Sequence, residues 1–292
     1  MKKLNDIAFR IVLSLTLVLP LSCYYAPSEY FNRSPSVDKR APEIKELNDT
    51  PTENVKSTLG TSYDILVLTD IHFGHKVDAR HDDDVVDWLE SLGTKPKFCV
   101  NLGDTADHGE MNEFNDWLTN LESGIKDKIN APVYSVIGNH DLRRNGWESF
   151  KTNIYPYTSC YHFESTGMSY YFLDTADGTL GKQQLKNLEE AFKADTKPKV
   201  VFSHEPIYHD KSNLLSATAL QDTHEADRIF TIFARNNVLL YLCGHSHAFR
   251  NNNYGSFTEY NLPSYLHSRA WGLIHIDETT GTATPELISV DE

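Results

Sequence analysis

The chain has 292 residues, 40% of them hydrophobic, and a formal net charge of −14 at neutral pH. This length and apolar content suffice for one domain with a sizeable core. The acidic balance repels polyanions. It therefore excludes proteins that hold long nucleic acids by neutralising phosphates, and we expect no stable nucleic-acid binding.

The first 22 residues have the pattern of a signal peptide. A short basic start is followed by "IVLSLTLVLPLS", an apolar run of 12 residues that is too short to span a bilayer comfortably. Cys23 then follows Ser22, which resembles the lipobox of bacterial lipoproteins, although Pro20 stands where a lipobox usually has leucine. We expect cleavage of residues 1–22 and an exported protein held in the cell envelope by a lipid on Cys23. The alternatives are a periplasmic or secreted protein without the lipid, and an uncleaved anchor.

The next segment, residues 23–60, is rich in proline, serine and charged residues and shows no sustained hydrophobic period. This composition predicts an irregular tether, or a segment that wraps around the folded part. We expect the folded domain to cover residues 61–292.

Within the domain, apolar runs typical of buried strands alternate with segments of helical spacing. Strands are expected at 63–70, 96–104, 131–141, 197–206 and 238–247, a hairpin at 161–175, and helices at 82–93, 109–124, 182–194 and 223–237. The alternation predicts an α/β (α+β) fold with a mixed sheet.

Five of the predicted strands end in a polar motif: "LTDIH", "NLGD", "IGNHD", "FSH" and "CGHSH". The carboxyl ends of strands are where open α/β sheets build their binding sites. Each motif alone is weak, since Gly-Asp and Gly-Asn also form ordinary turns and Asp107 could cap a helix. The candidates that the five motifs supply together are Asp70, His72, Asp104, Asn139, His140, Asp141, His204, His245 and His247.

The chemistry of these side chains favours a metal site. Carboxylate, imidazole and amide oxygen suit Mn, Fe, Zn or Ni, and the candidates are too numerous for one ion. The set therefore indicates two ions. A pair of ions can clamp both the attacking and the leaving oxygen of a phosphoryl displacement.

The ordered set D-x-H, G-D, G-N-H-D, H and G-H-x-H resembles the calcineurin-like metallophosphoesterase superfamily, from Asp70 to His247. The resemblance implies a four-layer sandwich of two mixed β-sheets flanked by α-helices. It also implies a metal-dependent phosphoester hydrolase that uses a metal-bridging hydroxide. The implied ligands are Asp70, His72 and His247 for one ion, Asn139, His204 and His245 for the other, and Asp104 between them.

Two further residues take roles from the same resemblance. His140 would lie beside the metals and stabilise the phosphoryl oxygens or protonate the leaving group. Asp141 would orient His140 and fix its tautomer.

The substrate is less well defined by the sequence. Asp107 stands where purple acid phosphatases carry an iron-ligating tyrosine, and "GDTADHG" resembles phosphodiesterase-like members. We therefore expect small phosphodiesters or nucleotides. Candidate substrate contacts are His108, Arg143 and Tyr208, the last in the long irregular segment 205–222. The alternatives are an exported phosphomonoesterase or nucleotidase, and a surface lipoprotein that acts mainly by binding.

Overall fold

The computed structural model describes residues 34–77, 79–208 and 219–290. The predicted signal peptide and Cys23 lie outside these residues. Within the described ranges, no helix has the length and apolar character needed to cross a bilayer.

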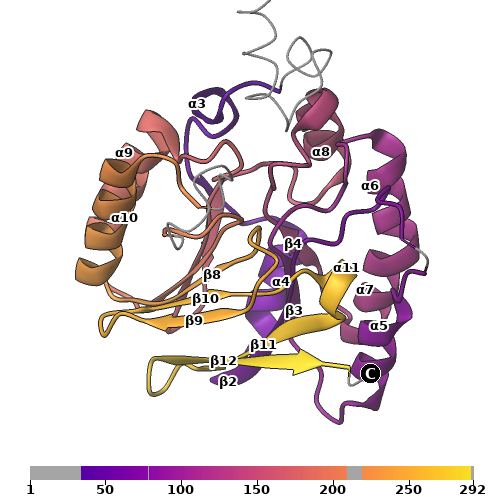
Figure 1. Cartoon of the computed structure of the whole chain (residues 1–292). Helices are drawn as coiled ribbons and strands as arrows, with labels where there is room; N and C mark the ends of the chain where they lie inside the picture. The colour runs from indigo at the N-terminus through magenta and orange to yellow at the C-terminus, as the bar shows by residue number, and fades with distance from the viewer. Residues whose placement is uncertain (1–33, 78, 209–218, 291–292) are drawn as a thin grey trace, which may run out of the picture. The chain divides into compact units, whose positions relative to one another are not determined.

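Two mixed β-sheets pack face to face in the centre of the domain (Figure 1). The first, in spatial order, contains β1 (Lys45–Glu46), β5 (Tyr161–Glu164), β6 (Ser169–Phe172), β7 (Lys199–Phe202), β8 (Val238–Cys243), β10 (Thr258–Asn261) and β9 (Arg250–Asn253). The second contains β12 (Thr282–Ser289), β11 (Ala270–Asp277), β2 (Ser62–Leu68), β3 (Phe98–Asn101) and β4 (Val133–Ser135).

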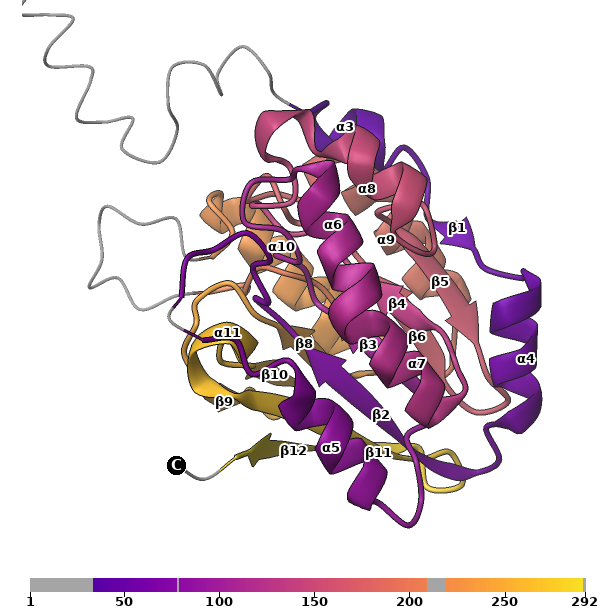
Figure 2. The ribbon, with the colours of Figure 1, turned by 90° about the vertical axis from the view of Figure 1, so that its right-hand side faces the viewer.

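Helices cover the outer face of each sheet, as Figures 1 and 2 show from two sides. The first sheet is covered by α9 (Gly181–Ala194) and α10 (Thr223–Arg235). The second is covered by α5 (Asp83–Ser91), α6 (Met111–Trp117), α7 (Ser123–Ile129) and α8 (Trp147–Asn153). The predicted four-layer arrangement is therefore confirmed.

The central strands, such as β2 and β6, bury both of their faces, which explains their continuous apolar runs. Along β2, Ile65 and Val67 face the other sheet, while Leu66 and Leu68 face the helices. Along β6 the same alternation places Phe172 between the sheets and Tyr171 under α9. Because side chains alternate between the two faces of a strand, these strands fill three apolar layers: one between the sheets and one between each sheet and its helices.

Over residues 34–60 the structure agrees with the second of the two expectations, a segment that wraps around the folded part. Instead of an irregular tether, this segment forms α3 (Val37–Arg40), β1 and α4 (Thr50–Thr58). Val37 and Ala41 join the layer under α9, and Val55 joins the layer between the sheets. The apolar residues are too few and too widely spaced to give a period, so this packing was not predictable from the pattern.

Smaller differences concern element bounds. The predicted helix 109–124 continues through a π-helical turn at Leu118–Glu122 into α7, which ends at Asn130 with a left-handed backbone. The predicted strand 131–141 pairs only over Val133–Ser135, because the rest of the run forms the loop that leads to the G-N-H-D motif.

Candidate active site

All five polar motifs follow strands that end at one side of the two sheets. Asp70 and His72 come after β2, Asp104 after β3 and Asn139 after β4 in one sheet. His204 follows β7, and the G-H-S-H motif follows β8, in the other. The site is therefore assembled where the ends of the two sheets meet.

Three groups of ligand atoms converge there, each within 4.8 Å. The groups are Asp70, His72 and His247; His72, Asp104 and His140; and Asp104, His204 and His245. Asp104 belongs to two groups, so it lies between the ends of the site. The expected ligand that these groups omit, Asn139, is an amide, and it lies beside the third group.

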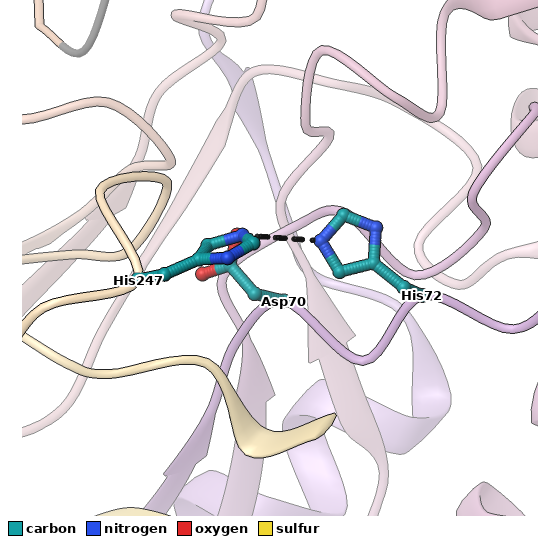
Figure 3. A group of neighbouring side chains, drawn as sticks. All are labelled: Asp70, His72 and His247. Atoms are coloured by element: carbon teal, nitrogen blue, oxygen red, sulfur yellow. Dashed lines mark hydrogen bonds and ion pairs between the residues drawn. The ribbon is translucent and has the colours of Figure 1, made fainter. Parts of the chain in front are cut away.

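The first group is shown in Figure 3. The Nε2 atoms of His72 and His247 face each other at 3.3 Å, and His247 Nε2 lies 3.1 Å from Asp70 Oδ1. Asp70 Oδ1 is buried and has no hydrogen-bond donor in the described structure. The other oxygen, Oδ2, accepts from the backbone amide of His245, which ties the first motif to the last.

The third group, Asp104, His204 and His245, is built around Asn139 Oδ1. His204 Nε2 lies 3.1 Å and His245 Nδ1 2.9 Å from this oxygen, and Asp104 Oδ2 lies 3.3 Å from His204 Nε2. His204 is fully buried, and its Nδ1 donates to the carbonyl of Leu102 at 3.0 Å. In its neutral form, with the proton on Nδ1, the ring would direct the Nε2 lone pair at two oxygens.

These contacts fit a pair of cations. Lone pairs of carboxylate, amide and imidazole atoms point at one another, an arrangement that is unfavourable until positive charge is placed between them. Burial alone would lower the pKa of His204, but the charges of Asp104 and Asp70 outweigh it and raise the value to about 10. The cluster therefore favours positive charge. A metal ion would supply that charge and could accept several of these lone pairs at once.

The backbone of the motifs is strained. Asp70, His72, Asp104, His245 and His247 have φ between 50° and 64°, the left-handed region that non-glycine residues seldom adopt. Such strain clusters at functional sites, where the surrounding structure holds it. In this protein the left-handed backbone turns side chains from the same short loop, such as Asp70 and His72, toward the same point.

Two motif glycines are explained by close approach rather than by strain. A Cβ on Gly244 would lie 1.9 Å from Thr69 Oγ1 and 2.5 Å from Asp70 Oδ2. A Cβ on Gly138 would lie 2.2 Å from both the amide nitrogen and Oδ1 of Asp104. No side chain fits at either position, so the loops can meet only through glycine.

Comparison with known proteins agrees with this site. A family model described as calcineurin-like phosphoesterase matches residues 63–249. The chain belongs to this family. It is therefore a phosphoric ester hydrolase, and the resemblance predicted from the motifs is confirmed. A comparison with curated protein sequences gives no significant match.

Solved structures share the fold of this phosphoesterase at low identity. A dimetal phosphatase from Danio rerio is 13% identical, with a TM-score of 0.53 over 78% of this chain and 99% of the other. GAP50, the anchor in the inner membrane complex of Plasmodium, is 12% identical, with a TM-score of 0.57 over 80% and 90%. A candidate 5′-nucleotidase from Staphylococcus aureus is 13% identical, with a TM-score of 0.52 over 79% and 55%.

In this phosphoesterase, His140 lies at the edge of the metal groups and is held from two sides. Its Nδ1 lies 3.0 Å from the carbonyl of Asp107 and 3.1 Å from that residue's Oδ1. Its Nε2 accepts from Arg143 Nη2 at 2.9 Å. These contacts place the proton on Nδ1 and turn Nε2 toward the site, 4.0 Å from Asp104 Oδ2.

The orienting carboxylate is thus Asp107, and the expectation that Asp141 orients His140 is wrong. Asp141 is fully buried, and its two oxygens accept from the backbone amides of Ala106 (2.8 Å) and Gly138 (2.9 Å). It joins two motif loops instead. Asp107 also lies 3.4 Å from Nδ1 of His72, a role that the sequence signals only through the segment "GDTADHG".

The three expected substrate contacts lie in different surroundings. Arg143 contacts His140, as described. His108 is part-exposed beside the site, and its Nδ1 bonds to Glu113 Oε1 at 2.8 Å. The hydroxyl of Tyr208 instead donates to Asp227 on α10 at 2.5 Å, so this hydroxyl is held by the helix.

Proposed function

We propose that this phosphoesterase hydrolyses small phosphodiesters, including nucleotide-like diesters, at a two-metal site. The observation that supports the proposal is the position of Asp104, which forms one group with His72 and His140 and another with His204 and His245. We assign Asp70, His72 and His247 to one ion, and Asn139, His204 and His245 to the other. When bound, the pair would supply an acidified bridging water for attack on phosphorus and would neutralise phosphoryl charge.

The protein's own groups complete the reaction. Asp107 holds the proton on Nδ1 of His140, which leaves Nε2 as the atom that faces substrate. A proton on Nε2 would be donated to a phosphoryl oxygen or to the leaving group. Arg143 contacts the same nitrogen, so its guanidinium is placed to bind the phosphoryl group once Nε2 becomes a donor.

The position of the site suits a small substrate. The side chain of His247 is 39% exposed and that of His140 19%, while Asp70 and His204 are buried. Among the described residues, His140 and His247 are therefore open to an approaching substrate, while Asp70 and His204 are covered. A phosphomonoester would use the same groups, so monoester and nucleotide hydrolysis is the second candidate activity.

A role in binding alone is disfavoured. The Danio rerio and Plasmodium structures share this fold, and the latter is described as an anchor, so the fold by itself does not decide between enzyme and anchor. Facing lone pairs and five left-handed ligand residues would be costly to retain in a protein without metal chemistry.

We also propose that the enzyme is exported and anchored to the cell envelope through a lipid on Cys23. This proposal is supported only by the sequence pattern of residues 1–23. Metabolic labelling with a fatty acid and detergent phase partition test it. Cys23→Ser should lose the label and leave the detergent phase, whereas unchanged partition would contradict the lipid anchor.

The activity is tested with two chromogenic esters. Bis-p-nitrophenyl phosphate and p-nitrophenyl phosphate are incubated with Mn²⁺-loaded protein, with and without chelator. We expect faster hydrolysis of the diester and loss of both activities with chelator. Asn139→Ala and His140→Ala should each lower kcat at least a hundredfold, while the exposed His224→Ala serves as control. If the loaded protein hydrolyses neither ester, the proposal is wrong.

A further inference from the structure

The N-terminal strap, defined here as residues 34–41, is fixed by a buried ion pair. The guanidinium of Arg40 donates to both oxygens of Asp174, from Nε at 3.0 Å and from Nη2 at 2.9 Å. Both side chains are fully buried. Nη1 lies 3.2 Å from Asp177 Oδ2, which also accepts from the amide of Val37 at 2.8 Å. A pair of this kind holds its geometry strictly, because neither charge has water as an alternative partner.

Asp174, the partner of Arg40, is next to Thr175 in the chain. Thr175 contacts the residues on either side of His204. Thr175, next to Asp174, is buried, and its Oγ1 lies 2.8 Å from Ser203 Oγ. The same oxygen accepts from the amide of Glu205 at 3.0 Å. Ser203 and Glu205 are the two neighbours of His204. The strap is thus connected to the loop that places the His204 imidazole.

The other end of the strap contacts the G-N-H-D loop. Ser34 Oγ donates to the carbonyl of Leu142 at 2.8 Å and accepts from the amide of Trp147 at 3.1 Å. Leu142 follows Asp141 directly, three residues after Asn139. The strap therefore spans the two loops that carry Asn139 and His204, whose ligand atoms lie 3.1 Å apart.

We propose that the strap is a positioning element for one half of the metal centre, and that Arg40 is its main positioning residue. The proposal rests on the two-metal site proposed above. The strap braces the Asn139 and His204 loops, while no contact described here links it to Asp70, His72 or His247. Its loss should therefore weaken the ion at Asn139, His204 and His245 selectively.

The expected size follows from how strongly supporting residues affect metal sites. Removing a group that orients a ligand typically costs 10- to 100-fold in metal affinity. Arg40 acts through Asp174 and Thr175 rather than on a ligand directly, so we expect a loss near the lower end, about tenfold. The other ion should keep its affinity.

The test measures metal binding rather than hydrolysis. Metal-free full-length protein is titrated with Mn²⁺ alone by calorimetry, and bound metal is counted after dialysis. His247→Ala and Asn139→Ala serve as references that show which binding event belongs to which half. Arg40→Ala is compared with Lys39→Ala, an exposed neighbour on α3. We expect Arg40→Ala to weaken only the event that Asn139→Ala removes, and Lys39→Ala to match wild type.

Folding and partial rescue complete the design. Arg40→Lys restores the charge but not the bidentate geometry, so its affinity should fall between those of wild type and Arg40→Ala. If Arg40→Ala does not fold, Ser34→Ala, which removes one hydroxyl, decides by the same titration. Unchanged binding of both ions, or equal weakening of both, would overturn the strap proposal. Wild-type protein that binds fewer than two ions would refute the two-metal function itself, which distinguishes the two failures.

Discussion

Replacing Asp107 by asparagine tests the most specific feature of the site, the fixing of His140. The contacts of this carboxylate with His140 and His72 lower its pKa, although burial alone would raise it, so Asp107 is ionised in the folded protein. Asparagine keeps the size of the side chain but removes the charge. It leaves two other contacts of His140 intact, the backbone carbonyl of residue 107 and Arg143.

The expected loss of activity follows from the one contact that the substitution removes. One charge-assisted hydrogen bond is lost, which is worth about 1.5–3 kcal/mol and corresponds to roughly a 10- to 150-fold fall in rate. His140→Ala should cost more, about 100- to 10,000-fold, since the whole proton-transferring group is removed. The effect of Asp107→Asn should appear in kcat, with little change in thermal stability.

The assay is steady-state hydrolysis of bis-p-nitrophenyl phosphate at saturating Mn²⁺. Saturation is necessary because Asp107 also lies 3.4 Å from His72, so the variant should need more metal for half-maximal activity. Asp116→Asn, the same charge change at an exposed position of α6, is the matched control.

A second variant separates the structural assignment from the one expected from sequence. Asp141→Asn would place an amide N–H₂ against a backbone N–H and should lower the free energy of unfolding by about 1–3 kcal/mol. Wild-type kcat in Asp107→Asn, together with a kcat loss and unchanged stability in Asp141→Asn, would refute the assignment of Asp107.

Three further outcomes are expected. Tyr170→Phe should lower the free energy of unfolding in urea by about 1–2 kcal/mol, because it removes one hydroxyl from the Tyr63–Tyr170–Glu278 hydrogen-bond network. Tyr157→Phe, at an exposed ring, should leave the free energy of unfolding unchanged. Equal stabilities of the two variants would contradict the network. Gly244→Ala should abolish high-affinity metal binding, measured by calorimetry, since its Cβ would collide with Thr69 and Asp70, whereas Gly93→Ala, with no atom within 4 Å, should bind as wild type. Mn²⁺ at a hundred times its Kd should stabilise the protein by about 2.7 kcal/mol for each bound ion in thermal unfolding, and chelator should reverse this. A melting temperature that does not depend on metal would contradict the site.

The sequence predicts the layers well, and it predicts that the side chains of the five motifs meet at one place, because both features depend on local patterns. Continuous apolar runs such as 63–70 mark strands buried on both faces, and each motif is placed by the strand that precedes it. Contacts between residues far apart in the sequence are not predicted by such local patterns. Arg40 contacts Asp174, which lies 134 positions later in the chain, and no pattern in residues 34–60 predicts that contact.

The side-chain network around His140 was predictable only in part, for a related reason. The family resemblance implied Asp141 as the partner of His140, but consecutive side chains leave the backbone in different directions. The ring instead meets Asp107, 33 positions earlier, because both loops end at the same side of the sheet. Tyr208 likewise lies next to a motif but bonds to Asp227, which α10 brings beside it.

Strain in the motif loops and metal binding are two parts of one energetic argument. Each left-handed aspartate or histidine costs on the order of 1 kcal/mol, and the five motif residues of this kind lie on three loops that come together around Asp104. Hydrogen bonds such as that from the His245 amide to Asp70 hold the loops together without metal. Asp70 Oδ1, however, is buried and has no hydrogen-bond donor among the residues that the structure describes. An ion that binds this oxygen removes that deficit while the strained backbone keeps the ligand directions fixed. Metal binding should therefore stabilise the loops beyond their own contacts, and the loops should be the first region to exchange amide hydrogens when metal is removed.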